Sequence, residues 1–136
     1  MSSTPGPHEL ELTRMILGPK GEATLKQVTP TFYEELDRDF GSFAGHVLIQ
    51  HGEFDEPWGI WEMHPRGDEF VYLLAGETDF LVKHPGEPVE TIRVDRPGSY
   101  VVVPRGAWHT AAPRGLCSLL FVTPGEGTAH APEPPE

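Results

Sequence analysis

Two stretches in the middle of the chain constrain its fold most. The first, residues 58–76, reads WGIWEMHPRGDEFVYLLAG and places Glu62 and His64 two positions apart in an apolar run. In a β-strand, that spacing puts both side chains on one face. Glu69 opens the next apolar run, after a turn, and in the second stretch, GSYVVVPRGAWH, His109 ends a strand bounded by Gly and Pro. Burying two carboxylates and two imidazoles requires ion pairing or a metal ion, so these residues predict a divalent cation site.

The spacing of these stretches resembles that of the two cupin motifs. The first motif is His-x-His, three or four residues, Glu, six residues and Gly; here it reads EMH, PRGD, E, FVYLLA, G. The second is Gly, five residues, Pro-x-Gly, two residues and His; here it reads G, SYVVV, PRG, AW, H. The matching positions are Glu62, His64, Glu69, Gly76, Gly98, Pro104, Gly106 and His109.

This resemblance implies an all-β fold, the double-stranded β-helix or jelly-roll barrel, with Glu62, His64, Glu69 and His109 as metal ligands. The chain departs from the pattern at three positions. Glu62 stands where the first His is expected, Glu56 where a Gly is expected, and Pro113 where an Asn is expected. The first departure changes a ligand position.

The ligand set predicts the kind of ion. Two oxygens and two nitrogens without sulfur suit Fe, Mn, Zn or Ni and disfavour soft metals. The alternative is a metal-free network in which His64 and His109 offset the two carboxylates, with the pKa of one carboxyl raised by the other. The metal site is favoured because all four positions carry residues that can ligate.

The pattern of the remaining chain agrees with a small barrel. Its 136 residues suffice for about one domain. At least seven short apolar runs, separated by turns rich in Gly and Pro, indicate an antiparallel sandwich or barrel. One short peripheral helix is expected over residues 32–40, where Thr31 and Glu34 have the spacing of a capping box. We expect a disordered segment over 1–9, a single cupin domain over 10–124 and a Pro/Glu-rich tail over 125–136.

Composition excludes several partners. The formal charge of −11 argues against nucleic acid and anionic membrane surfaces. No apolar run approaches the roughly 20 residues of a membrane span, and no signal-peptide pattern opens the chain, so a cytoplasmic location is expected. The lone Cys117 excludes an internal disulfide. Strands apolar on both faces need a cover, which predicts a homodimer through the outer sheet.

A pocket for a small-molecule ligand is expected beside the metal ligands. Trp58, Phe70, Tyr100 and Trp108 are its candidate walls, although aromatic residues in such positions more often belong to the core. Arg105, beside His109, is the candidate cation for a substrate carboxylate or phosphate. For Arg66, in the turn after His64, a solvated pair with Asp68 is the better explanation.

Two functions follow from these expectations. The first is a metal-dependent enzyme, dioxygenase- or isomerase-like, acting on a small organic molecule. The alternative is a non-catalytic sensor or accessory module that binds a small ligand or a metal. The fold alone does not decide between them.

Overall fold

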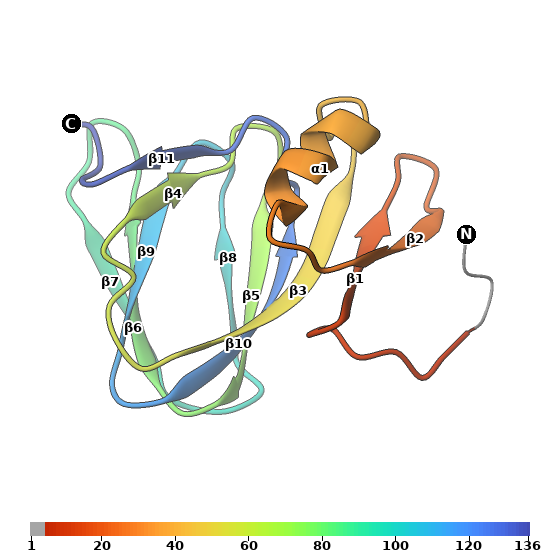
Figure 1. Ribbon diagram of the computed structural model, residues 1–136. Helices are drawn as coiled ribbons and strands as arrows, with labels where there is room; N and C mark the ends of the chain where they lie inside the picture. The colour runs from red at the N-terminus through yellow and green to blue at the C-terminus, as the bar shows by residue number, and fades with distance from the viewer. Residues whose placement is uncertain (1–4) are drawn as a thin grey trace.

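The computed structural model describes residues 5–136, which form two antiparallel sheets and one helix (Figure 1). The elements are β1 (Thr13–Leu17), β2 (Ala23–Gln27), α1 (Phe32–Asp39), β3 (Val47–Phe54), β4 (Trp61–Met63), β5 (Glu69–Ala75), β6 (Thr78–Lys83), β7 (Glu90–Val94), β8 (Tyr100–Val103), β9 (Trp108–Pro113), β10 (Cys117–Thr123) and β11 (Ala129–Ala131). One sheet has the order β2-β1-β3-β10-β5-β8, and the other has the order β11-β4-β9-β6-β7. The predicted all-β jelly roll with one short helix is confirmed.

The barrel forms because its strands alternate between two environments. In β5, Val71 and Leu73 point inward while Leu74 is exposed, and in β6 Phe80 and Val82 point inward. Inward side chains from both sheets meet in one apolar core, since each strand buries one of its two faces. This barrel core consists of Val71, Leu73, Phe80, Val82, Val94, Val101, Val103, Ala107, Ala111, Cys117, Leu119 and Phe121.

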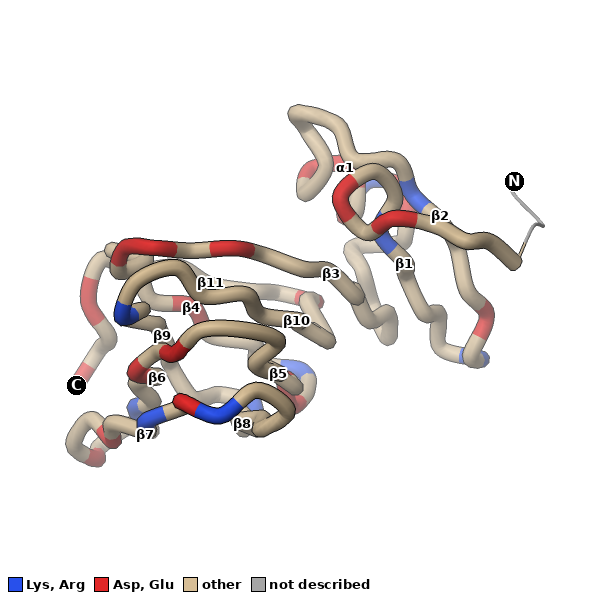
Figure 2. The backbone as a smooth tube through the Cα atoms, turned by 90° about the horizontal axis from the view of Figure 1, so that it is seen from below, with Lys and Arg blue, Asp and Glu red and all other residues tan. Residues whose placement is uncertain are grey.

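A second, smaller unit lies to one side of the barrel, and we call it the N-terminal layer (residues 13–44; Figure 2). The hairpin β1–β2 extends the six-stranded sheet beyond β3, and α1 packs beside it. Its core is formed by Ile16, Phe32, Leu36, Phe43 and Leu48. Because Leu48 belongs to β3, this core is continuous with the sheet of the barrel.

The helix begins and ends close to the expected positions, but its first turn is held differently. The Thr31 side chain makes no capping bond to the backbone. Its hydroxyl donates instead to Glu35 Oε2 at 2.5 Å, and the other oxygen of Glu35 pairs with Lys26 Nζ at 2.5 Å. The expected capping box with Glu34 is therefore replaced by a bond that ties the helix to β2.

We expected the second motif to form a single strand, but it forms two. β8 ends at Val103, a turn follows, and His109 lies in β9, which continues to Pro113. Gly106 makes this turn possible because its φ of 82° is a conformation that L side chains rarely adopt. The Gly106 N–H donates to the His64 carbonyl at 3.0 Å, so the turn joins the two motifs directly.

The first and last residues of the chain were expected to lie outside the folded domain, and the structure differs from this most clearly near residue 130. Residues 129–131, assigned to a tail outside the domain, form β11 and pair with β4, His130 opposite Glu62. Of the segment expected to be disordered, residues 1–4 lie outside the described residues, and residues 5–9 contain neither helix nor strand. Next to it, Glu11 Oε1 lies 2.6 Å from His51 Nδ1, which connects the segment before β1 to β3. Within the described residues, the single helix is too short and too polar to cross a membrane.

Candidate metal centre

The fold brings the four predicted ligands to one place. Glu62 in β4 is the register partner of His109 in β9, and His64 follows directly after β4. One ligand atom from each of these three residues lies within 4.8 Å of the other two. Glu69, the first residue of β5, completes the group, since its Oε1 lies 3.0 Å from His109 Nε2 and 3.5 Å from His64 Nε2.

These atoms are close together without being hydrogen-bonded to one another. His64 Nε2, His109 Nε2 and Glu69 Oε1 are all buried and have no hydrogen-bond partner. The two imidazole nitrogens lie within ion-pair range of Glu69 Oε1, but neither contact is a hydrogen bond. Buried polar atoms are rarely left unpaired. Three such atoms that converge on one point are the arrangement expected around a cation.

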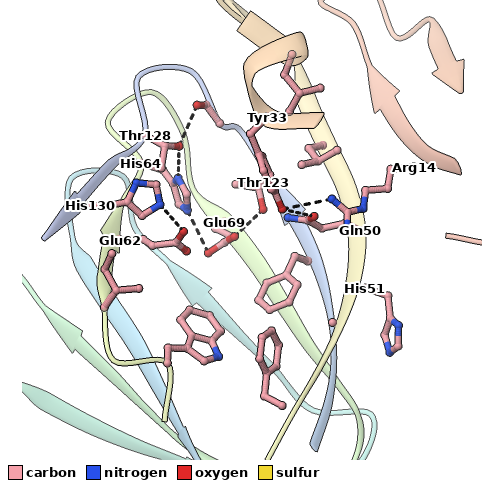
Figure 3. A pocket seen from close by; sticks show the side chains of 18 of the residues that line it. Arg14, Tyr33, Gln50, His51, Glu62, His64, Glu69, Thr123, Thr128 and His130 are labelled. Atoms are coloured by element: carbon pink, nitrogen blue, oxygen red, sulfur yellow. Dashed lines mark hydrogen bonds and ion pairs between the residues drawn. The ribbon is translucent and has the colours of Figure 1, made fainter. Parts of the chain in front are cut away.

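A hydrogen bond behind His64 fixes which of its nitrogens is free. Thr128 Oγ1 donates to the Gly125 carbonyl at 2.9 Å and lies 2.8 Å from His64 Nδ1 (Figure 3). Because the hydroxyl has a single hydrogen, which it donates to Gly125, it must accept from the Nδ1–H of His64. In the neutral imidazole, Nε2 then carries a lone pair directed at the cluster, as metal ligation requires.

Glu69 is held by a similar bond on its far side. Thr123 Oγ1 donates to Glu69 Oε2 at 2.6 Å, which leaves Oε1 facing the two imidazoles. Burial raises the pKa of this carboxyl, but the neighbouring His109 and His64 more than offset that effect and lower the pKa to about 2. Glu69 is therefore a carboxylate near neutral pH.

Glu62, at the position that departs from the family pattern, has its own partner. His130 Nε2 lies 2.8 Å from Glu62 Oε2 and donates to it, while Glu62 Oε1 lies 3.8 Å from His109 Nε2. The Glu62 side chain is 28% exposed, against 4% for Glu69. Of the two carboxylates, Glu62 is therefore the more accessible from the solvent.

His109 is held by rings rather than by hydrogen bonds. It is fully buried, and its ring stacks on Phe80 at 5.7 Å and meets Trp58 at 6.3 Å. Its Nδ1 has no hydrogen-bond partner. Packing therefore fixes the direction of Nε2 in His109, whereas a hydroxyl fixes it in His64.

A cavity of about 940 Å³ opens onto the centre. Glu62, His64 and Glu69 line one part of it, together with Thr128 and His130. His109 lies behind this wall. The apolar residues of the cavity come from both units of the molecule: Leu36, Phe43, Leu48, Phe54, Trp58, Ile60 and Phe121.

Among the pocket residues expected from sequence, the structure places only Trp58 on the cavity. Phe70 and Tyr100 lie on the outer face of the sheet with their rings 4.9 Å apart. The strand period explains the correction, because an inward Glu69 turns Phe70 outward and an inward Val101 turns Tyr100 outward.

The strand period also explains why the prediction for Trp108 is wrong. Trp108 precedes the buried His109 in β9, so its side chain is turned away from the cavity. Arg105 is also outside the cavity. It is exposed in the turn after β8, where its backbone N–H donates to Asp68 Oδ1 at 2.9 Å. Arg66 is exposed as well and does not line the cavity.

Three residues that support the metal ligands were not among the predicted site residues: Thr123, Thr128 and His130. Thr123 carried a usable signal, since it shares the inward face of β10 with Leu119 and Phe121 and is the polar member of that series. Thr128 and His130 carried none, because the Pro- and Glu-rich composition of their segment is typical of a disordered tail.

Comparison with known proteins identifies the fold. No family model matches the chain, and no curated protein matches it. Among solved structures, oxalate oxidase with the substrate analogue glycolate aligns at a TM-score of 0.53 and 22% identity over 61% of this chain and 45% of that one. Oxalate decarboxylase from Bacillus subtilis, described with Mn(II) centres, aligns at 0.51 and 16% identity over 62% and 23% of the two chains.

A third structure shows that the likeness concerns the fold alone. Peruvianin-I, a cysteine peptidase from Thevetia peruviana latex, aligns at a TM-score of 0.50 and 17% identity over 61% of this chain and 54% of that one. The chain thus spans about half or less of the length of these three structures. Their activities differ, and so do not carry over with the architecture. With two antiparallel sheets packed around the barrel core, and with these neighbours, the chain has the cupin fold.

Proposed function

We propose that the protein is a metal-dependent enzyme acting on a small organic molecule in the cavity. One observation carries the proposal: His64 Nε2, His109 Nε2 and Glu69 Oε1 converge, buried and unpaired, beside a cavity large enough for a ligand. A metal-free network would leave these atoms at the full cost of burial, roughly 1–3 kcal/mol each. A cation removes that cost.

The four ligands fit a divalent ion of the Fe, Mn, Zn or Ni class. Glu62, His64, Glu69 and His109 offer oxygen and nitrogen donors without sulfur, and two carboxylates offset most of the charge of such an ion. When bound, the ion would polarise an oxygen of the substrate and orient it. Glu69 and the two histidines, which are the most buried of the four, would hold the ion together with Glu62 as the more exposed fourth ligand.

We assign a second role to Glu62. It is the more exposed carboxylate, and His130 holds its Oε2. A carboxylate at the cavity wall can accept a proton from a bound substrate. The N–H of His130 occupies Oε2, so Oε1 would take that proton, and because Glu62 is partly exposed the proton can then be released to solvent. An isomerase-like reaction requires such a base, and a dioxygenase-like reaction can use one.

Elemental analysis of protein purified without chelators tests whether the site holds a metal. Glu62→Ala tests the ligand that differs from the cupin pattern. We expect about one equivalent of a transition metal in the wild type and a clear loss in Glu62→Ala. Glu90→Ala, which removes an exposed carboxylate of β7, should keep the metal. A metal-free wild type that also fails to take up added Fe, Mn, Zn or Ni would overturn the proposal.

Turnover separates the enzyme from the sensor. Metal-loaded protein should consume O2 or form product with at least one member of a panel of small acids, phenols and sugars. Saturable binding across the panel without turnover would contradict the enzyme and favour the sensor or accessory module.

We also propose a homodimer through the outer face of the six-stranded sheet. The side chains of Phe70, Tyr72, Leu74, Tyr100 and Val102 form an apolar patch there, in which Tyr100 is 59% and Val102 is 51% exposed. A contiguous patch of this kind needs a cover. Light scattering should give a dimer mass that Val102→Glu reduces to a monomer mass. A monomeric wild type at working concentration would end this part of the proposal.

A further inference from the structure

The cavity that reaches the metal centre also contains an arginine from the N-terminal layer. Arg14 in β1 is the single Lys or Arg among the described residues that line it. Figure 3 shows its side chain extending toward Tyr33 and Gln50, on the side of the cavity away from His64 and His130. The metal ligands come from the barrel, whereas Arg14 comes from the N-terminal layer.

The guanidinium of Arg14 is held in place but not neutralised. It lies over the Phe32 ring at 4.7 Å from the ring centroid and 5.8 Å from that of Tyr33. Nη1 donates a long hydrogen bond of 3.3 Å to the Tyr33 hydroxyl, and Nε is buried without a partner. No carboxylate of the described chain forms an ion pair with it. A buried N–H donor without a partner, on a guanidinium held by two rings, is suited to bind an anion.

Two neighbours add polar groups to the same spot. The Tyr33 hydroxyl donates to Gln50 Oε1 at 2.9 Å. That bond uses the oxygen of the Gln50 amide and orients its NH₂ group, which remains a donor. Together with Arg14, Gln50 can therefore offer N–H groups to an oxyanion. We call Arg14, Tyr33 and Gln50 the arginine subsite.

The surroundings decide which oxyanion fits. A single cation balances one negative charge, and the other charged residues that line the cavity are acidic, Asp37 and Glu53 among them. These would repel a phosphate dianion more strongly than a carboxylate. A planar guanidinium also matches the two oxygens of a carboxylate.

The size and walls of the cavity describe the rest of the ligand. Its volume of about 940 Å³ lies near the upper end of the roughly 300–1,000 Å³ typical of small-molecule sites. It is thus far larger than the smallest organic acids need. Leu48 and Phe121 are among its apolar lining residues, and Trp58 adds a buried indole N–H that has no partner.

We propose that the arginine subsite binds the carboxylate of an extended organic acid whose other end carries the oxygen donor that reaches the metal centre, with an apolar segment between them. This inference rests on the proposed function for the metal-binding end of the ligand. The carboxylate end rests on the arginine subsite and not on the metal.

Calorimetry with matched probes tests it. The probes are alkyl hydroxamates that end in a carboxylate, with spacers of increasing length, and the methyl ester of each. The hydroxamate is a chelator that stands in for the oxygen donor. With metal-loaded wild type, the best acid should bind about tenfold or more tightly than its ester. In Arg14→Gln this preference should disappear while ester affinity and metal content stay unchanged. Arg14→Lys should retain part of the preference and serves as a second variant if Arg14→Gln folds poorly.

The outcomes separate this proposal from the function on which it rests. Equal binding of acid and ester to the wild type, a preference that persists in Arg14→Gln, or no binding of any acid at millimolar concentration would overturn the arginine subsite. If the protein binds no metal, the proposed function fails, yet the acid-over-ester preference and its loss in Arg14→Gln can still be measured on the metal-free protein. His109→Ala should weaken acid and ester together and leave their ratio unchanged.

Discussion

The barrel and the N-terminal layer enclose one cavity but are built in different ways. The barrel has a large apolar core and surrounds its polar centre with buried strands, so that His109 is fully buried. The N-terminal layer has a core of a few side chains, and charged pairs near its surface such as Lys26 with Glu35 supplement that core. Its polar group toward the cavity, Arg14, lies on a short hairpin rather than between two sheets.

This difference indicates a division of labour within the cavity. The proposed metal site lies on the barrel, where hydrogen bonds fix His64, Glu69 and Glu62, and ring packing fixes His109. The proposed site for the remote end of a small molecule lies on the layer, which can change without disturbing the metal ligands. The comparison predicts that the two units respond differently to substitution and to pH.

The largest effect on stability should come from truncating a side chain in either of the two cores. Phe80→Ala removes a fully buried ring of the barrel core that also stacks on His109. It should lower the free energy of unfolding by about 3–5 kcal/mol and weaken metal binding as well. Leu36→Ala in the layer should cost about 2 kcal/mol, near the lower end for such truncations, because the small core can relax. Urea unfolding and metal titration measure both. Metal affinity that falls equally in the two variants would show that the units are not separate.

A smaller effect is expected from the support of His64. Thr128→Val keeps the shape of the side chain but removes the acceptor for the Nδ1–H of His64. The imidazole is then no longer held in the tautomer that leaves Nε2 free for a metal. Metal affinity should fall by about ten- to a hundredfold, and the unfolding free energy should fall by about 1–3 kcal/mol because the Nδ1–H of the buried His64 loses its partner. Thr91→Val, at a position exposed on β7, is the matched control and should leave affinity unchanged. An affinity within twofold of wild type in Thr128→Val would mean that packing alone orients His64.

The smallest effect concerns acid pH and the N-terminal layer. Hydrogen bonds from Lys26, and then from Thr31 and Thr29, lower the pKa of Glu35 from 4.5 to about 2. A lowered pKa means that the carboxylate stabilises the fold at pH values above about 4.5, and that this contribution is lost as pH falls toward 2. The stability difference between wild type and Glu35→Gln should therefore be greatest near neutral pH and shrink below pH 4.5. A difference that does not change with pH would contradict the assignment.

The sequence predicted the barrel well because motif spacing and strand period are local signals. Glu62, His64, Glu69 and His109 were expected to meet, and their ligand atoms lie within a few ångströms of one another. The strand period also excludes Phe70 and Tyr100 from the pocket. Adjacent residues of a strand face opposite sides, and Phe70 is next to the inward Glu69 while Tyr100 is next to the inward Val101.

The remaining residues could not be predicted from local signals. Arg14 and Thr128 reach the cavity through pairings between distant segments, and neither has a spacing that marks it. His130 lies in a segment whose composition is typical of disorder, yet three residues of that segment add a strand to the sheet. Short pairings of this kind depend on the edge that receives them, which no local pattern describes.

The position of β11 has a practical consequence. Two of the groups that steady the metal ligands, Thr128 and His130, lie on the short stretch that ends in β11, which joins the sheet only through its pairing with β4. Proteolytic cleavage within that stretch would loosen the centre while most of the barrel stayed intact. Preparations intended for metal analysis should therefore be checked by mass spectrometry for an uncut stretch.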